Sequence, residues 1–213
     1  MSRFHPPTPP SYTITQDASG ACTIHLIPQV QILLEDEVAP EIYLIPTKSR
    51  TAVALALFKH IGAKFTLIYS HGNATDLGLM IPILAQMSKM LKINVIGYDY
   101  SGYGASTGSP TEQQAYNDID AVFVWVGSAL GVADNTIILY GQSLGSGPST
   151  YIASRKSVAG LVLHSAIMSG LRVLTEKRGI FACCDIFPNI DRIRRVRCLV
   201  LIIHGEVWCL FFQ

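Results

Sequence analysis

Residues 141–145, with the sequence GQSLG, place the tightest constraint on how this chain can fold. They follow an apolar run at 136–140 that is typical of a short buried strand, and they precede residues 146–154, which are typical of a helix start. Strand, G-x-S-x-G and helix together predict a nucleophile elbow, whose glycines permit a tight, strained turn. The turn lifts the hydroxyl of Ser143 above the sheet, where the helix N-terminus favours negative charge. Ser143 is therefore the candidate catalytic nucleophile, and the alternative is an ordinary serine in a glycine-rich turn.

Strands and helices alternate along most of the chain. Short β-rich runs at 22–27, 42–45 and 52–58 predict an antiparallel edge built from hairpins. From residue 65 onward the pattern predicts strands at 65–70, 93–98, 136–140, 161–164 and 198–204, and helices at 77–91, 111–130 and 144–156. This alternation predicts an α/β fold with a mostly parallel, doubly wound sheet, in which ligands bind beyond the carboxyl ends of the strands.

Length and composition limit the class of protein. The 213 residues suffice for one α/β domain, which we expect at 21–205, after an irregular proline-rich lead-in at 1–20 and before a divergent tail at 206–213. The hydrophobic content of 49% suits a sheet that is buried on both faces. Lys and Arg number 16 against 15 Asp and Glu, so the net charge of +1 is too small to attract nucleic acid, and we expect no nucleic-acid partner.

Membrane and metal signals are weak. The longest apolar stretch, 121–133, is shorter than the ~20 residues of a membrane span, and the N-terminus does not have the pattern of a signal peptide. The five cysteines show no metal-ligand spacing, so we expect no metal and no cofactor. These features favour a cytoplasmic protein, with contact at a membrane periphery left open.

A His-Gly turn ends the predicted strand at 65–70. Gly72 lets the backbone bend sharply, so that the N–H of Asn73 can point at a developing oxyanion. The N–H of Leu144, the residue after the nucleophile, is the expected second donor. Two such donors stabilise an acyl-transfer transition state by on the order of 3 kcal/mol each. We expect His71 to pack under this turn rather than act as a general base, and Asp76 to cap the following helix.

The segment at 96–104 places three tyrosines beside glycines. Tyr98, Tyr100 and Tyr103 are consistent either with one wall of an acyl pocket or with a core loop beneath the sheet edge. Asp99 lies in this segment but precedes Ser143. In a catalytic triad built on a G-x-S-x-G elbow the acid follows the serine in the chain, so we do not expect Asp99 to be the triad acid.

Five motifs stand together in order: YSHGNA at 69–74, DLG at 76–78, YDYSGYGASTG at 98–108, LYGQSLGSGP at 139–148 and DIFPNID at 185–191. With them the chain resembles the α/β-hydrolase domain-containing protein 17 family over residues 4–205. The resemblance implies an α/β-hydrolase fold and a serine hydrolase that removes palmitate from cysteines of membrane-associated proteins. It implies that Ser143 attacks a thioester while Asn73 and Leu144 hold the oxyanion. It also implies S-acylated proteins as partners and a location in the cytoplasm or at the plasma or endosomal membrane.

The sequence departs from the family pattern after Gly205. The family continues with T-x-D-E, whose Asp is the triad acid, and the triad His follows tens of residues later. Here Trp208 stands at the position of the acid, and no residue stands at the position of the His, so we expect the fold to lack its last strand and helix.

Substitutes for the missing residues are poor. His164 and His204 are the histidines that follow Ser143, and Glu206, Asp185 and Asp191 are candidate acids, but we expect neither histidine to act as base. The chain is therefore expected to be inactive, because the triad His carries the proton transfer. Two alternatives stay open: a non-catalytic domain that binds an acyl group or a partner, and a truncated, non-functional product.

Overall fold

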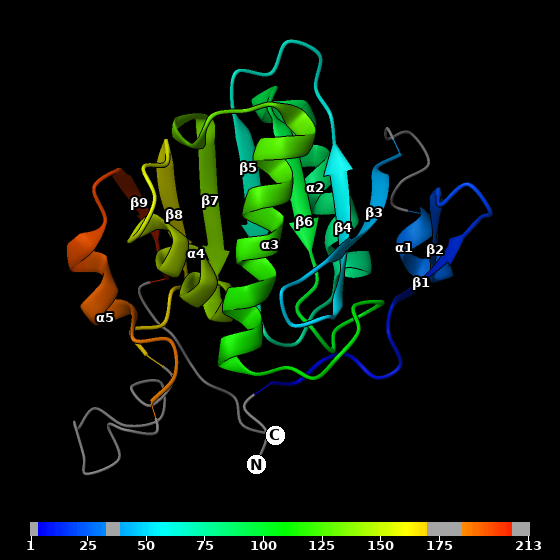
Figure 1. Ribbon diagram of the computed structural model, residues 1–213, viewed down its shortest axis with the longest axis horizontal. Helices are drawn as coiled ribbons and strands as arrows, with labels where there is room; N and C mark the ends of the chain where they lie inside the picture. Colours follow the sequence, from blue (N-terminus) through cyan, green and yellow to red (C-terminus); the bar gives the residue numbers. More distant parts are fainter. Residues whose placement is uncertain (1–3, 33–38, 170–184, 206–213) are drawn as a thin grey trace.

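A nine-stranded sheet in the order β1-β2-β3-β4-β6-β5-β7-β8-β9 forms the framework of the molecule (Figure 1). A computed structural model describes residues 4–32, 39–169 and 185–205. The strands are β1 (Tyr12–Gln16), β2 (Cys22–Leu26), β3 (Glu41–Pro46), β4 (Ala52–Phe58), β5 (Thr66–Ser70), β6 (Asn94–Tyr98), β7 (Ile137–Gln142), β8 (Gly160–His164) and β9 (Leu199–Ile203). The helices are α1 (Pro28–Gln31), α2 (Leu77–Leu91), α3 (Glu112–Leu130), α4 (Ser146–Ala153) and α5 (Asn189–Arg192), with 3-10 turns η2 (Asp134–Thr136), η3 (Ser143–Gly145) and η5 (Ile193–Arg195).

The sheet has an antiparallel part and a parallel part. Strands β1 to β4 pair antiparallel in sequence order, and β4 also pairs antiparallel with β6. Strands β6, β5, β7, β8 and β9 pair in parallel. The predicted hairpin edge and the predicted parallel sheet are both confirmed. Since the parallel strands share one direction, the loops that follow β5, β6, β7 and β8 meet at one edge of the sheet.

The prediction of an irregular lead-in was wrong for residues 12–16. These residues form β1, whose Tyr12 lies opposite Leu26 of β2. Alternation of Tyr12 and Ile14 with Thr13 and Thr15 gives the period of two that a strand requires. The prolines that indicated irregular chain end at Pro10, so they do not interrupt the pairing.

Helices cover both faces of the parallel sheet. In Figure 1, α3 and α4 cross the front of the sheet and α2 lies behind it. Helix α2 packs against β4 and β6, whereas α4 packs against β7, β8 and α3. Two hydrophobic clusters result, one on each face. Asp76 caps α2 by accepting a hydrogen bond from the N–H of Leu79, as predicted.

Strand β9 forms the outer edge of the parallel half. All five of its residues, Leu199–Ile203, are exposed, from 39% at Val200 to 86% at Leu199. Among the described residues, β8 is the one strand that pairs with β9. The predicted tail at 206–213 lies outside the described residues.

Candidate active site

The elbow around Ser143 has the backbone that the sequence predicts. Strand β7 ends at Gln142, Ser143 has a φ of +51°, and η3 leads directly into α4. A left-handed conformation costs a non-glycine residue free energy, so its presence here marks a turn imposed by its surroundings. A Cβ on Gly145 would lie 2.0 Å from the carbonyl oxygen of Ser70, and one on Gly141 would lie 2.6 Å from the carbonyl oxygen of Gly145. Both glycines are therefore required by close backbone contact.

The loop that follows β5 lies beside this elbow. We call residues 71–77, which run from the end of β5 to the start of α2, the oxyanion loop. Ser70 lies opposite Gly141 in the parallel pairing of β5 with β7, so the oxyanion loop and the elbow leave the sheet side by side. A Cβ on Gly72 would lie 3.9 Å from the Cβ of Ser143. The structure thus brings Asn73, Ser143 and Leu144 to one place, while their catalytic roles remain a prediction.

A pocket of about 430 Å³ opens at this place. Its polar part includes Gly72, Asn73 and Ser143. Its apolar part consists of Tyr69 and Tyr140, whose rings stack with centroids 4.6 Å apart, and of side chains from α2, namely Met80, Ile83 and Met87. The pocket can therefore take a ligand with a polar carbonyl at Ser143 and an apolar chain along α2.

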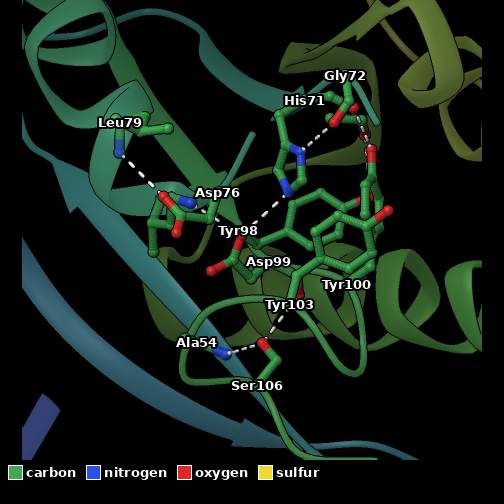
Figure 2. A network of polar contacts seen from close by, with 12 residues as sticks. Ala54, His71, Gly72, Asp76, Leu79, Tyr98, Asp99, Tyr100, Tyr103 and Ser106 are labelled. Atoms are coloured by element: carbon green, nitrogen blue, oxygen red, sulfur yellow. Dashed lines mark hydrogen bonds and ion pairs between the residues drawn. The ribbon is translucent and has the colours of Figure 1, made fainter. Parts of the chain in front are cut away.

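His71 and Asp99 form a buried pair beneath the oxyanion loop (Figure 2). His71 Nε2 lies 3.0 Å from Asp99 Oδ1, and His71 Nδ1 lies 2.7 Å from the carbonyl oxygen of Gly72. The predicted packing of His71 under the turn is confirmed, and the ring does not line the pocket. The same Asp99 Oδ1 accepts from the N–H of Leu77 at 2.8 Å, and Oδ2 accepts from the Tyr12 hydroxyl at 2.5 Å. Burial, and then the charge of Asp99, holds the pKa of Tyr12 well above its usual range, so its hydroxyl stays a donor.

The three tyrosines of the 96–104 segment lie in the core. Tyr98, Tyr100 and Tyr103 are at most 1% exposed and do not line the pocket, so the core-loop alternative is correct. Two of them still support the oxyanion loop. The Tyr100 hydroxyl donates to the carbonyl oxygen of His71 at 2.7 Å, and the Tyr103 hydroxyl donates to Asn73 Oδ1 at 2.7 Å.

The histidines after Ser143 have other partners. His164 lines the pocket, but its Nδ1 lies 2.9 Å from the Tyr140 hydroxyl. His204 follows β9, and its Nδ1 lies 3.0 Å from the carbonyl oxygen of Gly205. Within residues 4–32, 39–169 and 185–205, no histidine nitrogen is hydrogen-bonded to the Ser143 hydroxyl. Asp185 and Asp191 do not line the pocket, and Glu206 and Trp208 lie outside the described residues.

Sequence reasoning missed two residues that hold the elbow from behind. The Ser146 hydroxyl donates to the carbonyl oxygen of Ser143 at 2.6 Å. The Asn189 amide donates to Ser146 Oγ at 3.0 Å and to the carbonyl oxygen of Ile167 at 2.9 Å. Asn189 lies within the 185–191 motif, but no local sequence pattern connects that motif to Ser143, which lies 46 positions earlier in the chain.

Neither a metal site nor a spanning helix is found in the described part of the chain. No cluster of three or more His, Cys, Asp or Glu side chains there could hold a metal ion. Among the helices described, none is both long enough and apolar enough to cross a membrane.

Comparison with known proteins defines the class. A family model described as "alpha/beta hydrolase fold" matches residues 66–182. An α/β hydrolase from Vibrio vulnificus superposes with a TM-score of 0.67 at 17% identity, covering 85% of this chain and 70% of that one. An α/β serine hydrolase homologue from Coxiella burnetii superposes with a TM-score of 0.58 at 18% identity, covering 79% and 88%. The fold is therefore that of the α/β hydrolases.

Closer relatives align with almost the whole chain. "Alpha/beta hydrolase domain-containing protein aho-3" of Caenorhabditis elegans is 44% identical over 95% of this chain. "Alpha/beta hydrolase domain-containing protein 17B" of Homo sapiens is 39% identical, also over 95% of this chain. The chain spans 61% of the length of the first relative and 71% of the second. The chain belongs to the α/β-hydrolase domain-containing protein 17 family, as the motifs at 69–191 predict.

Proposed function

We propose that the Ser143 pocket is the acyl site of a serine hydrolase that cleaves the thioester of S-acylated proteins in the cytoplasm or at a membrane surface. The observation that carries the proposal is the pocket itself. It combines a serine in a strained elbow and Asn73 at one end with the apolar side chains of α2 at the other. A long acyl chain needs such an apolar part, and a thioester carbonyl needs hydrogen-bond donors.

The chemistry assigns a role to each group. Ser143 Oγ forms a bond to the thioester carbonyl carbon while its proton passes to a base. The carbonyl oxygen becomes an oxyanion that the N–H groups of Asn73 and Leu144 stabilise. Collapse then breaks the C–S bond, and the cysteine thiolate leaves and takes up a proton. Water attacks the acyl-enzyme ester by the same route and releases the fatty acid.

The base is the missing component in the described residues. In a serine hydrolase a histidine normally takes the serine proton, and removal of one triad member slows the reaction by orders of magnitude. We therefore propose that these 213 residues, assayed alone, bind acyl groups with little turnover. The second candidate function, a non-catalytic acyl-binding domain, is favoured by the bond of His164 to Tyr140 rather than to Ser143.

An S-palmitoylated cysteine peptide tests the proposal in two measurements, binding by fluorescence anisotropy and thiol release. We expect the wild-type protein and the Ser143→Ala variant to bind the peptide equally well. We also expect equal, background rates of thiol release from both proteins. Thiol release that is faster in the wild type than in Ser143→Ala would contradict the expected low turnover and would establish hydrolase activity. A folded wild-type protein that does not bind the peptide would overturn the acyl site.

A further inference from the structure

We propose that the N-terminal segment of the chain, residues 4–12, holds the oxyanion loop in place, with Tyr12 and Asp99 as positioning residues. The inference rests on the proposed function for its catalytic meaning, because the oxyanion loop carries Asn73. The contacts themselves are independent of any activity. Two of them reach the oxyanion loop directly and the third reaches it through Asp99, and they join residues that lie 65 to 87 positions apart in the sequence.

The first contact is to the side chain of Asn73. The backbone N–H of His5 donates to Asn73 Oδ1 at 2.9 Å, and the Tyr103 hydroxyl donates to the same oxygen. Phe4 holds the backbone of this segment in place, since it is 7% exposed and its ring packs edge-on against Phe187 at 6.1 Å. The residue expected to donate its N–H to the oxyanion is thus fixed from its side-chain end.

The second contact is to Asp76, near the end of the oxyanion loop. The backbone N–H of Ser11 donates to Asp76 Oδ2 at 2.7 Å, and the Ser11 hydroxyl donates to Asp76 Oδ1. Asp76 is fully buried and also accepts from the N–H of Leu79. A Cβ on Gly78 would lie 2.4 Å from Ser11 Oγ, so this glycine permits the close approach of the segment. The start of α2 and residues 4–12 are therefore joined through one carboxylate.

The third contact is to Asp99 and reaches both ends of the oxyanion loop. Asp99 Oδ1 lies at ion-pair distance from His71 at the start of the loop (Figure 2). The same oxygen accepts a hydrogen bond from the N–H of Leu77 at the end of the loop. The Tyr12 hydroxyl binds the other oxygen, Oδ2. A Cβ on Gly104 would lie 2.0 Å from Asp99 Oδ2, so a glycine there leaves room for this arrangement. The Asp99 carboxylate therefore fixes both ends of the oxyanion loop, and the Tyr12 hydroxyl fixes the position of that carboxylate.

The donors of residues 4–12 also stabilise the buried carboxylates of Asp76 and Asp99. Asp76 and Asp99 are both 0% exposed; Asp76 belongs to the oxyanion loop, and Asp99 contacts both of its ends. A buried carboxylate is unfavourable unless several donors bind it, and its charge opposes a second negative charge nearby. Residues 4–12 supply three of the donors, from the Ser11 N–H, the Ser11 hydroxyl and the Tyr12 hydroxyl. Loss of one donor would loosen the loop and disfavour the oxyanion.

Hydrogen exchange of the backbone amides, read by mass spectrometry, tests the positioning without need of activity. Tyr12→Phe removes the hydroxyl from Asp99 but keeps the ring. Tyr43→Phe is the matched control, because its hydroxyl donates to the carboxylate of Glu41 at the surface of β3. We expect exchange at residues 71–77 to be about tenfold faster in Tyr12→Phe and unchanged in Tyr43→Phe, with α3 unaffected in both.

A second pair of variants addresses the His5 contact. His5→Pro deletes the N–H that Asn73 accepts, whereas His5→Ala keeps it. We expect faster exchange at 71–77 in the proline variant alone. If His5→Pro, His5→Ala and Tyr12→Phe all exchange at 71–77 at the wild-type rate, the inference is overturned. Uniformly faster exchange over the whole sheet would overturn it too, because it would show a general loss of stability.

Affinity for hexadecyl trifluoromethyl ketone, whose carbonyl takes up the serine oxygen to give a bound oxyanion, links the positioning to the site. We expect Tyr12→Phe to bind the ketone about tenfold more weakly than wild type, and Tyr43→Phe to match wild type. Unchanged affinity in Tyr12→Phe would contradict a positioning role. If wild type does not bind the ketone, the proposed function fails, and hydrogen exchange alone decides whether residues 4–12 hold the loop.

Discussion

Asp118 is a buried carboxylate that joins α3 to the loop after β6. It is fully buried and accepts hydrogen bonds from the N–H of Ser101 at 2.7 Å and from the Ser101 hydroxyl at 2.8 Å. Burial raises the pKa of Asp118 to about 6, although both bonds from Ser101 oppose the shift. The folded state therefore binds the proton more tightly than the unfolded state, where the pKa is near 3.8.

The sign of the resulting pH dependence follows from this raised pKa. The contribution of Asp118 to stability falls as the pH rises from about 4 to about 6 and is constant above that window. When the pH is lowered from 7 to 5, the unfolding free energy of the wild type should rise by about 1 kcal/mol relative to that of Asp118→Asn. Urea unfolding of both proteins at both pH values measures this difference. An equal change of the unfolding free energy in both proteins would contradict the raised pKa.

At the scale of single elements, α2 forms the apolar part of the pocket. Met80, Ile83 and Met87 are spaced by three and four residues, so they lie on one face of the helix. Leu79 lies on the same helix but does not line the pocket, although it is exposed to a similar extent as Ile83, at 39% against 49%.

This difference provides a matched pair of variants. We expect Ile83→Glu to weaken binding of the S-palmitoylated peptide at least tenfold, because a charge would then face the acyl chain. Leu79→Glu should leave the affinity unchanged. Both substitutions lie at the surface and should change the unfolding free energy by about 0.5 kcal/mol or less. Equal affinities of the two variants would show that the chain does not lie along this face of α2.

The elements differ in how far the sequence predicts them. The elbow and the oxyanion loop were predictable because their chemistry is local: glycines at fixed offsets from Ser143 and a His-Gly turn at a strand end. Strand β1 was missed because prolines before it outweighed a five-residue alternation. The contacts of residues 4–12 with Asp76 and Asp99 were not predictable, since they depend on how segments far apart in the chain pack together.

At the scale of the whole molecule, the two edges of the sheet differ. The antiparallel edge ends in β1, where Tyr12 is buried and its hydroxyl donates to Asp99. The parallel edge ends in β9, whose apolar side chains are exposed on both faces. An exposed, apolar edge strand pairs readily with other chains. We expect these 213 residues alone to self-associate through β9.

A charge on β9 should reduce this association. Leu201→Lys places a lysine on an edge residue that is 57% exposed. Ile61→Lys is the control, because Ile61 is fully exposed but lies in the loop after β4. We expect the concentration-dependent light scattering to fall in Leu201→Lys and to stay at the wild-type value in Ile61→Lys. The same scattering in all three proteins would exclude β9 as the contact.

The proposed site requires Ser143 to be a nucleophile aligned with two oxyanion donors. Addition of Ser143 to hexadecyl trifluoromethyl ketone tests it at equilibrium: the serine oxygen bonds to the carbonyl carbon, the carbonyl oxygen becomes the oxyanion, and the serine proton passes to solvent. No leaving group is involved, so the adduct is detected at equilibrium and does not require turnover. Fluorine NMR should show a protein-bound tetrahedral adduct in the wild type and none in Ser143→Ala. A folded wild-type protein without that adduct would contradict the proposed site.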